Sequence, residues 1–144
     1  ATLLYDSGSL IKFWAASVPS GTSGSIVVSS SSGANGPFIS VWAVYRINAM
    51  TPTATAQFTN PTTSTTTSVS ISAQSKGVVL AAAASSIAGI SSASWSGATG
   101  DSNQLNSGTL FTTAAADDLA AGTLGLTVTW NVASFGRIAA IALR

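Results

Sequence analysis

The sequence contains no cysteine, no histidine and no glutamate among its 144 residues. Without cysteine, a disulfide frame and a thiolate metal site are excluded. Without histidine, a Ser–His–Asp triad and His-based metal sites are excluded as well. Glycosidase chemistry would need two of the four aspartates to face each other across a cleft. We therefore predict a protein that is not an enzyme and that binds neither a cofactor nor a metal ion.

Charge is scarce too. Charged residues make up 6% of the chain, whereas a typical soluble domain has roughly 25%. The five cations are scattered and form no basic patch, so nucleic-acid binding is not expected. Serine, threonine, alanine and glycine take the place of charges, which is typical of β-rich extracellular or particle-bound proteins. With a net charge of +1, charge repulsion between copies is weak and self-association is expected.

Long apolar runs are also absent. The longest candidate, residues 77–90, is interrupted by Ser85, Ser86 and Gly89, and a transmembrane helix needs roughly 20 apolar residues. Asp6 and Lys12 interrupt the first apolar run, so we predict neither a signal peptide nor a membrane partner. Because the chain begins at alanine, we expect an N-terminal part to precede it.

What the chain does have is the pattern of β-strands. In residues 122–130, four large apolar residues alternate with small or hydroxyl residues, as in a strand with one buried face. After a predicted turn at 131–134, residues 138–143 predict a second strand, apolar on both faces, and the pair is interpreted as a β-hairpin. Residues 25–29, a Gly/Asn turn and residues 39–47 repeat this pattern, the last as a strand covered on both faces.

Shorter patterns complete the predicted secondary structure. Further strands are expected at 1–5, 10–14, 69–71, 78–84, 94–96 and 109–113. At 78–84 a helix is the alternative, because alanine favours helices. Residues 97–108 are expected to form a polar loop, and 114–121 a loop or one helical turn.

A near-repeat predicts how these strands are organised. Residues 10–22 resemble residues 110–123, and each copy is followed by strands that end in Arg46 or Arg144. We predict an all-β fold, an antiparallel, jelly-roll-like β-sandwich built from two related half-units. Residues 1–47 would form the first half-unit and 68–144 the second. Residues 48–67, rich in Thr and Pro, would be a connection or an irregular edge strand. The first half-unit lacks a counterpart of 69–95, so upstream strands are expected to be missing.

The tryptophans are the main candidates for binding. Trp14 and Trp95 lie near predicted loops and could stack on sugar rings, with Asp101 and Asn103 as hydrogen-bonding partners. Trp42 and Trp130 are interpreted as core or as a subunit interface, because large aromatic side chains favour both. Tyr45 and Arg46 are added to them as subunit-interface candidates.

The remaining charged residues have ordinary interpretations beside functional ones. Asp117 and Asp118 could join backbone carbonyls in a Ca²⁺ site, although a solvated turn or helix cap is the commoner role. Arg46 and Arg144 could pair with these aspartates or with a carboxylate of another subunit.

Four stretches carry a resemblance to a known group of proteins: Pro19-Ser-Gly-Thr-Ser-Gly-Ser-Ile-Val-Val28, Val41-Trp-Ala-Val-Tyr-Arg46, Lys76-Gly-Val-Val-Leu-Ala81 and Ala139-Ala-Ile-Ala-Leu143. Over residues 10–144 the chain resembles β-sandwich virion surface proteins of tailed phages and prophages, largely of Alphaproteobacteria. No functional residue can be carried over from this resemblance.

The resemblance implies a structural virion protein, such as a capsid decoration, head-fibre or tail-spike component that acts by self-assembly. It would form a homo-oligomer, with a trimer favoured, and contact other virion proteins at the virion surface. One alternative is an extracellular, lectin-like carbohydrate-binding module for attachment to a host-surface glycan. Another is a bacterial surface or adhesin module. Oligomeric state and tryptophan exposure distinguish assembly from glycan binding.

Overall fold

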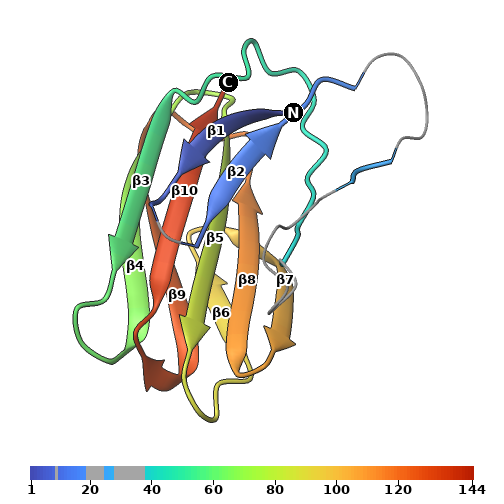
Figure 1. Cartoon of the computed structure of the whole chain (residues 1–144). Coiled ribbons are helices and arrows are strands. Elements are labelled where there is room, and N and C mark those ends of the chain that lie inside the picture. The colour runs from blue at the N-terminus through green and yellow to red at the C-terminus, as the bar shows by residue number, and fades with distance from the viewer. Residues whose placement is uncertain (9, 19–24, 28–37) are drawn as a thin grey trace.

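The computed structural model describes residues 1–8, 10–18, 25–27 and 38–144. These residues form strands and connections and contain no helix, and the antiparallel sheets pack face to face (Figure 1). The predicted all-β, antiparallel sandwich is therefore confirmed, while the jelly-roll connectivity and the two half-units stay predictions. Within the described residues, no helix is long and apolar enough to span a membrane.

The larger sheet has five strands in the order β3-β10-β5-β8-β7. Its members are β3 (Ala54–Thr59), β5 (Val78–Ser86), β7 (Thr99–Asn106), β8 (Thr109–Ala116) and β10 (Arg137–Leu143). The central strands β5 and β10 consist almost entirely of buried alanine, valine, leucine and isoleucine. Their sequences are apolar on both faces because other parts of the chain cover both faces of this sheet. The predicted strands at 78–84 and 138–143 are confirmed.

The smaller sheet has three strands in the order β4-β9-β6, with β4 (Ser64–Ala73), β6 (Ala93–Ser96) and β9 (Gly122–Ser134). Its inner face carries Ile71, Leu126, Val128 and Trp130, which pack against the five-stranded sheet in one buried cluster. The outer face carries mainly serine and threonine. This sheet has one buried face, so its strands show the period-two alternation that predicted them.

The chain changes sheets between β9 and β10. The predicted hairpin of these two strands is wrong, because β9 belongs to the three-stranded sheet and β10 to the five-stranded sheet. The predicted turn at 131–134 is also wrong, since β9 continues to Ser134 and the crossing follows at 135–136. Alternation shows that each strand has a buried face, but the same pattern arises whether two strands pair side by side or face each other across a sandwich.

A small buried polar network stabilises this crossing. Thr67 Oγ1 accepts hydrogen bonds from Trp130 Nε1 and from Asn60 Nδ2, each at 2.9 Å. The Asn60 N–H donates to the Gly136 carbonyl at 2.9 Å. Buried polar groups must be paired in this way to avoid the free-energy penalty of losing water. Side chains from three separate segments therefore hold the end of the sandwich together.

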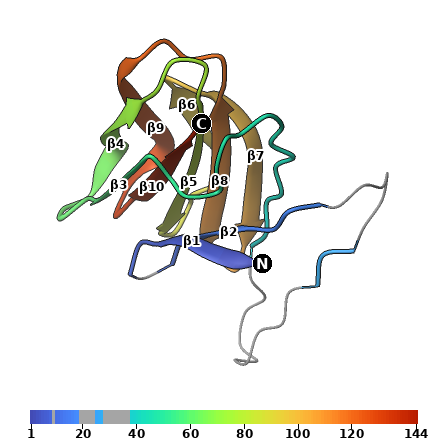
Figure 2. The ribbon, with the colours of Figure 1, turned by 90° about the horizontal axis from the view of Figure 1, so that it is seen from above.

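The N-terminal residues form a separate hairpin of β1 (Thr2–Asp6) and β2 (Lys12–Ala15). It lies on the face of the five-stranded sheet that points away from the three-stranded sheet (Figure 2). Ile11 and Phe13 are buried there against Leu80 and Ile141. The predicted strands at 1–5 and 10–14 are thus confirmed with small shifts, and they form a third layer over the sandwich.

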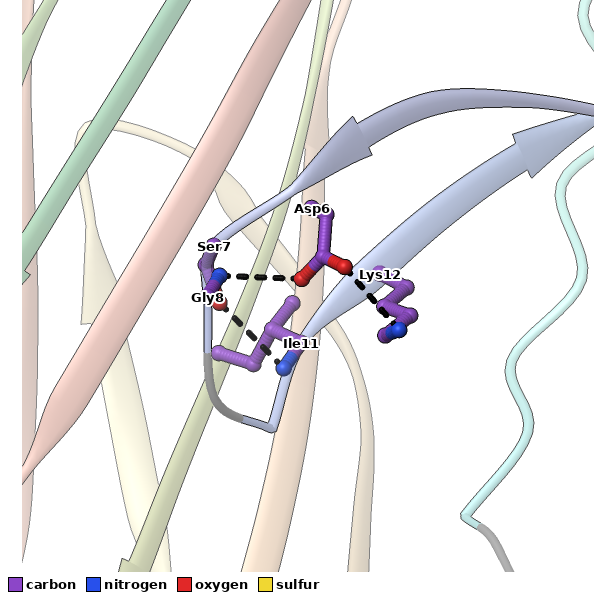
Figure 3. A network of polar contacts seen from close by, with 5 residues as sticks. All are labelled: Asp6, Ser7, Gly8, Ile11 and Lys12. Carbon is purple, nitrogen blue, oxygen red and sulfur yellow. Dashed lines mark hydrogen bonds and ion pairs between the residues drawn. The ribbon is translucent and has the colours of Figure 1, made fainter.

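Polar contacts order the turn of this hairpin (Figure 3). The Asp6 carboxylate accepts a hydrogen bond from the Gly8 N–H at 2.9 Å and pairs with Lys12 Nζ at 2.9 Å. The Ile11 N–H donates to Ser7 Oγ at 3.3 Å. The hydrogen bond from Lys12, and after it the one from Gly8, lower the pKa of Asp6 from its ordinary value. The charged carboxylate therefore joins the two ends of the turn.

Several other sequence-based predictions need correction. Residues 97–108 contain β7 instead of a loop, because a polar edge strand lacks the apolar alternation that identifies buried strands. Of the two alternatives predicted for residues 48–67, the edge strand is found, since this stretch contains β3 at the edge of the five-stranded sheet and the start of β4. For residues 114–121 the helical-turn alternative is wrong and the loop alternative holds for 117–121, because β8 continues to Ala116 and Asp118 adopts a φ of 48° in the following turn.

The predicted strand at 25–29 falls partly outside the described residues. Residues 25–27 are exposed and are not part of a strand. Residues 28 and 29 and the Gly/Asn turn predicted between 29 and 39 lie outside the described part, apart from residue 38.

Candidate functional site

Residues 38–47, which we term the outer strap, lie over β7 and β8 beside the N-terminal hairpin (Figure 2). The predicted strand at 39–47 is wrong, because these residues belong to no sheet. No backbone hydrogen bond joins residues 38–47 to β7 or β8. Side-chain contacts hold the strap instead, such as the hydrogen bond from Gln104 Nε2 to the Ile39 carbonyl at 3.4 Å.

The period-two pattern of the strap still reflects a real two-sided environment. Phe38 stacks on Phe111 of β8, with ring centroids 5.5 Å apart. Ser40 Oγ lies 3.3 Å from Ser102 Oγ, which in turn lies 2.9 Å from Thr113 Oγ1. The sheet-facing residues are half-buried and their neighbours exposed. The outward-facing residues are Ile39, Val41, Ala43 and Tyr45.

A β-bulge in β7 places Asp101 beneath this strap. Gly100 pairs with Ala114 and Ser102 with Thr113, so Asp101 is the extra residue between them. A bulge redirects the side chain of the inserted residue, and the Asp101 carboxylate accepts a hydrogen bond from Trp42 Nε1 at 2.7 Å. On its other side the Trp42 ring stacks on Phe13 of β2, with centroids 6.4 Å apart. Asp101 and Trp42 thus link the strap, the hairpin and the sheet.

Two shallow hollows flank the bulge. The first, of about 360 Å³, lies between the edge strands β6 and β7. There Trp95 Nε1 donates to Thr112 Oγ1 at 2.8 Å, and Asn103 Nδ2 donates to the Ala93 carbonyl at 3.1 Å. It is lined by Ala93, Ser94, Trp95, Gly100, Asp101, Ser102, Asn103 and Thr112.

The second hollow, of about 480 Å³, lies beneath the outer strap. Asp101 and Ser102 line both hollows, so the bulge separates them. Strap residues 39–43, together with Gln104 and Thr113, form the rest of the second hollow.

The structure brings together three of the four predicted sugar-binding residues. Trp95, Asp101 and Asn103 all line the first hollow. Trp14 lies elsewhere, on β2, where its side chain is 58% exposed and points away from the buried Phe13. The predicted set is therefore split between one hollow and one exposed ring.

The predicted interface set is split as well. Tyr45 is 82% exposed, and Arg46 is exposed with a φ of 60°. The Trp42 side chain is half-buried between the strap and the sheet. Trp130 is 2% exposed and belongs to the core between the sheets. Of the two alternatives predicted for Trp130, the core is correct, and a place in a subunit interface is wrong.

Sequence-based reasoning missed the aromatic and hydroxyl contacts beneath the strap. Phe38 and Phe111 were not singled out, and neither were Ser40, Ser102 and Thr113. The alternation of 38–45 is the signal that marks the strap residues. Their partners on β7 and β8 lie more than 60 residues away in the sequence, so no local pattern identifies them.

Apolar exposure is concentrated near the N-terminus. Ten of the thirteen large apolar side chains that are exposed in the described residues lie before residue 51. They are Leu3, Leu10, Trp14, Val18, Ile26, Val27, Ile39, Val41, Tyr45 and Met50. The described residues contain no group of three or more acidic or other metal-binding side chains. Exposed large apolar side chains of the described residues are therefore concentrated in the first third of the sequence.

Comparisons with models of protein families, with curated proteins and with solved structures found no match to this chain.

Proposed function

We propose that this chain is a structural protein that acts by self-assembly, and that it serves as a virion surface component such as a capsid decoration, head-fibre or tail-spike protein. The observation that carries the self-assembly is the concentration of exposed apolar side chains before residue 51. Ile39, Val41 and Tyr45 among them lie on the same outward side of residues 38–47, and apolar side chains gathered on one surface mark a contact with another molecule. The virion setting is supported by the sequence resemblance.

The outer strap is the centre of the proposed contact. Val41 and Tyr45 are 62% and 82% exposed, and exposed tyrosines commonly anchor protein interfaces. The half-buried Trp42, held by Asp101 and Phe13, supports them from below. With a net charge of +1, one copy repels another only weakly. A homo-oligomer built through this surface is the proposed unit, with a trimer as the first candidate.

The double substitution Val41→Asp and Tyr45→Asp is expected to weaken self-association by about tenfold or more, which corresponds to about 1.4 kcal/mol. Both carboxylates would lose their water in the contact. Sedimentation velocity over a concentration series measures the change. Thr123→Asp is the matched control, because Thr123 is exposed on the opposite sheet, and it should leave association unchanged. A wild-type chain that stays monomeric at hundreds of micromolar would contradict the proposal.

The virion setting has its own test. Particles from the native source are separated by sedimentation after nuclease treatment, and their proteins are identified by mass spectrometry. The chain should occur in the fast-sedimenting fraction at a fixed ratio to capsid or tail proteins. Recovery only in the slow, soluble fraction would remove the virion proposal and leave the self-assembly to be judged separately.

A second candidate function is the binding of a host-surface glycan in the first hollow. It is favoured by the meeting of Trp95, Asp101 and Asn103 there. An aromatic ring can pack against the apolar face of a sugar, and a carboxylate forms strong hydrogen bonds with its hydroxyl groups.

For this second candidate, Asp101→Ala is expected to weaken binding of a retained glycan by about tenfold, because a hydrogen bond to a charged group contributes about 1.5–3 kcal/mol. A glycan array identifies the ligand and titration calorimetry measures the loss. Trp14→Ala, which changes an exposed ring outside the hollow, should bind like the wild type. An array on which the chain retains no glycan would exclude this function.

A further inference from the structure

Sheet edges are sites where another chain can add a strand, because edge residues have unpaired N–H and C=O groups. In the described residues the two sheets end at β3, β7, β4 and β6. Three of these edges are protected. The six-residue β3 lies between Pro52 and Pro61, β7 has a bulge with Asp101 under the strap, and β6 has four residues.

The fourth edge, β4, has little such protection. It has ten residues, Ser-Thr-Thr-Thr-Ser-Val-Ser-Ile-Ser-Ala, without a charge or a proline. Proteins usually protect long edge strands with charged residues, prolines or bulges. The irregularity in β4 lies before Thr66, and pairing with β9 is unbroken from Thr66 to Ala73. Over most of its length β4 is therefore an uncharged edge strand with regular pairing to β9.

No strand of the described residues pairs with the outer edge of β4. β3, which precedes it, pairs with β10 in the other sheet. Asn60 Nδ2 donates to the Thr66 carbonyl at 2.9 Å, so one residue at the start of the edge is occupied. Residues 68–73 follow with Ser68, Ser70 and Ser72 exposed on the outer face and Ile71 buried on the inner face. The edge thus has one hydroxyl face and one apolar face.

We propose that β4 pairs antiparallel with β4 of a second copy of this chain across a twofold axis at Ser70. This proposal rests on the proposed self-assembly and names one of its contacts. In this register Ser68 opposes Ser72 and Val69 opposes Ile71, so hydroxyl groups meet hydroxyl groups and apolar groups meet apolar groups. A twofold axis makes the same surface serve both partners. The two three-stranded sheets become one six-stranded sheet.

A second copy fits this edge because its sequence is self-complementary. A partner strand with charged residues would find no opposite charge in β4, whose ten residues are all uncharged. Pairing through β4 uses a different surface from the outer strap. The two contacts together would link copies into an extended array, as a surface-coating protein requires.

Single-cysteine variants test the proposed register, because the wild-type chain contains no cysteine. In an antiparallel pair, opposed residues have Cα atoms about 4.5–5.5 Å apart, within the range that a disulfide spans. Ser70→Cys is expected to convert most of the chain to a disulfide-linked dimer under mild oxidation. Thr129→Cys is the matched control: Thr129 is exposed on the same sheet but lies on the central strand β9. It should stay at the background level of cross-linking.

Ser70→Lys provides a second test that needs no oxidation. A lysine on both sides of the axis would place like charges opposite each other, so the dimer should dissociate at concentrations at which Thr129→Lys still associates. Cross-linking of Ser70→Cys at control level, while the wild type sediments as an oligomer, would overturn the β4 contact and leave self-assembly intact. A monomeric wild type would overturn both.

Discussion

Replacing Trp130 by alanine is expected to lower the free energy of unfolding by about 3–5 kcal/mol, the usual cost of removing a large buried aromatic side chain. Trp130 is 2% exposed and packs in the cluster between the two sheets. Removing the indole leaves a cavity and also leaves Thr67 without the hydrogen bond from Trp130 Nε1. Urea unfolding followed by circular dichroism measures the change.

Two further variants separate the loss of the buried ring from the loss of the Trp130 N–H group. Trp130→Phe keeps an aromatic ring and removes the N–H, so it is expected to cost less, about 1–2 kcal/mol. Trp14→Ala is the matched control, because Trp14 is 58% exposed and surface substitutions usually change stability by less than about 0.5 kcal/mol. A stable, monomeric Trp130→Ala variant that had lost only self-association would contradict the place of Trp130 in the core.

Gly136→Ala is expected to be the second most disruptive of these substitutions, at about 1–3 kcal/mol or more. A Cβ atom at position 136 would overlap Thr67 Oγ1 and Trp130 Nε1 and would lie 2.9 Å from Trp130 Cε2. The backbone cannot easily move away, because the Gly136 carbonyl accepts a hydrogen bond from the Asn60 N–H. The added methyl group would therefore disturb the network at the crossing between β9 and β10.

The same substitution at Gly125 should not lower the free energy of unfolding. Gly125 lies in β9, and a Cβ atom there would meet nothing within 4 Å. Because glycine in a strand costs roughly 0.5–1 kcal/mol relative to alanine, Gly125→Ala is expected to be neutral or stabilising. Thermal unfolding of both variants under one set of conditions makes the comparison. Equal losses at the two positions would mean that the close contacts of Gly136 are unimportant.

Residue patterns predicted part of the candidate site. Trp95, Asp101 and Asn103 were predicted as one set, and they line one hollow. They lie within nine residues of each other, where the chain passes from β6 to β7, so their proximity follows from the sequence. Trp14 was grouped with them by residue type alone, and the fold places it on a different layer. Residue type indicates what a side chain can bind, but it does not indicate which side chains meet.

Contacts between distant segments could not be predicted in the same way. Trp42 and Asp101 are 59 residues apart in the sequence, and their hydrogen bond depends on a bulge that no local pattern revealed. The outer strap has the alternation of a strand, yet it lies over a sheet face through side-chain contacts and forms no ladder. Alternation indicates that one side of a segment is covered and the other is exposed to solvent. A segment that lies over a sheet face also has one covered and one exposed side.

The sequence by itself determined that the chain is all-β and where the buried strands lie. Val78–Ala84, Leu124–Trp130 and Ile138–Leu143 could each be placed because burial on one or both faces imposes a local pattern of apolar residues. Only the tertiary structure decided that β9 and β10 lie in different sheets, that the polar residues 99–106 form an edge strand, and that β4 lies at the edge of its sheet. Pairing and register depend on contacts between segments far apart in the chain. The local sequence of a polar strand face does not indicate which strand lies beside it.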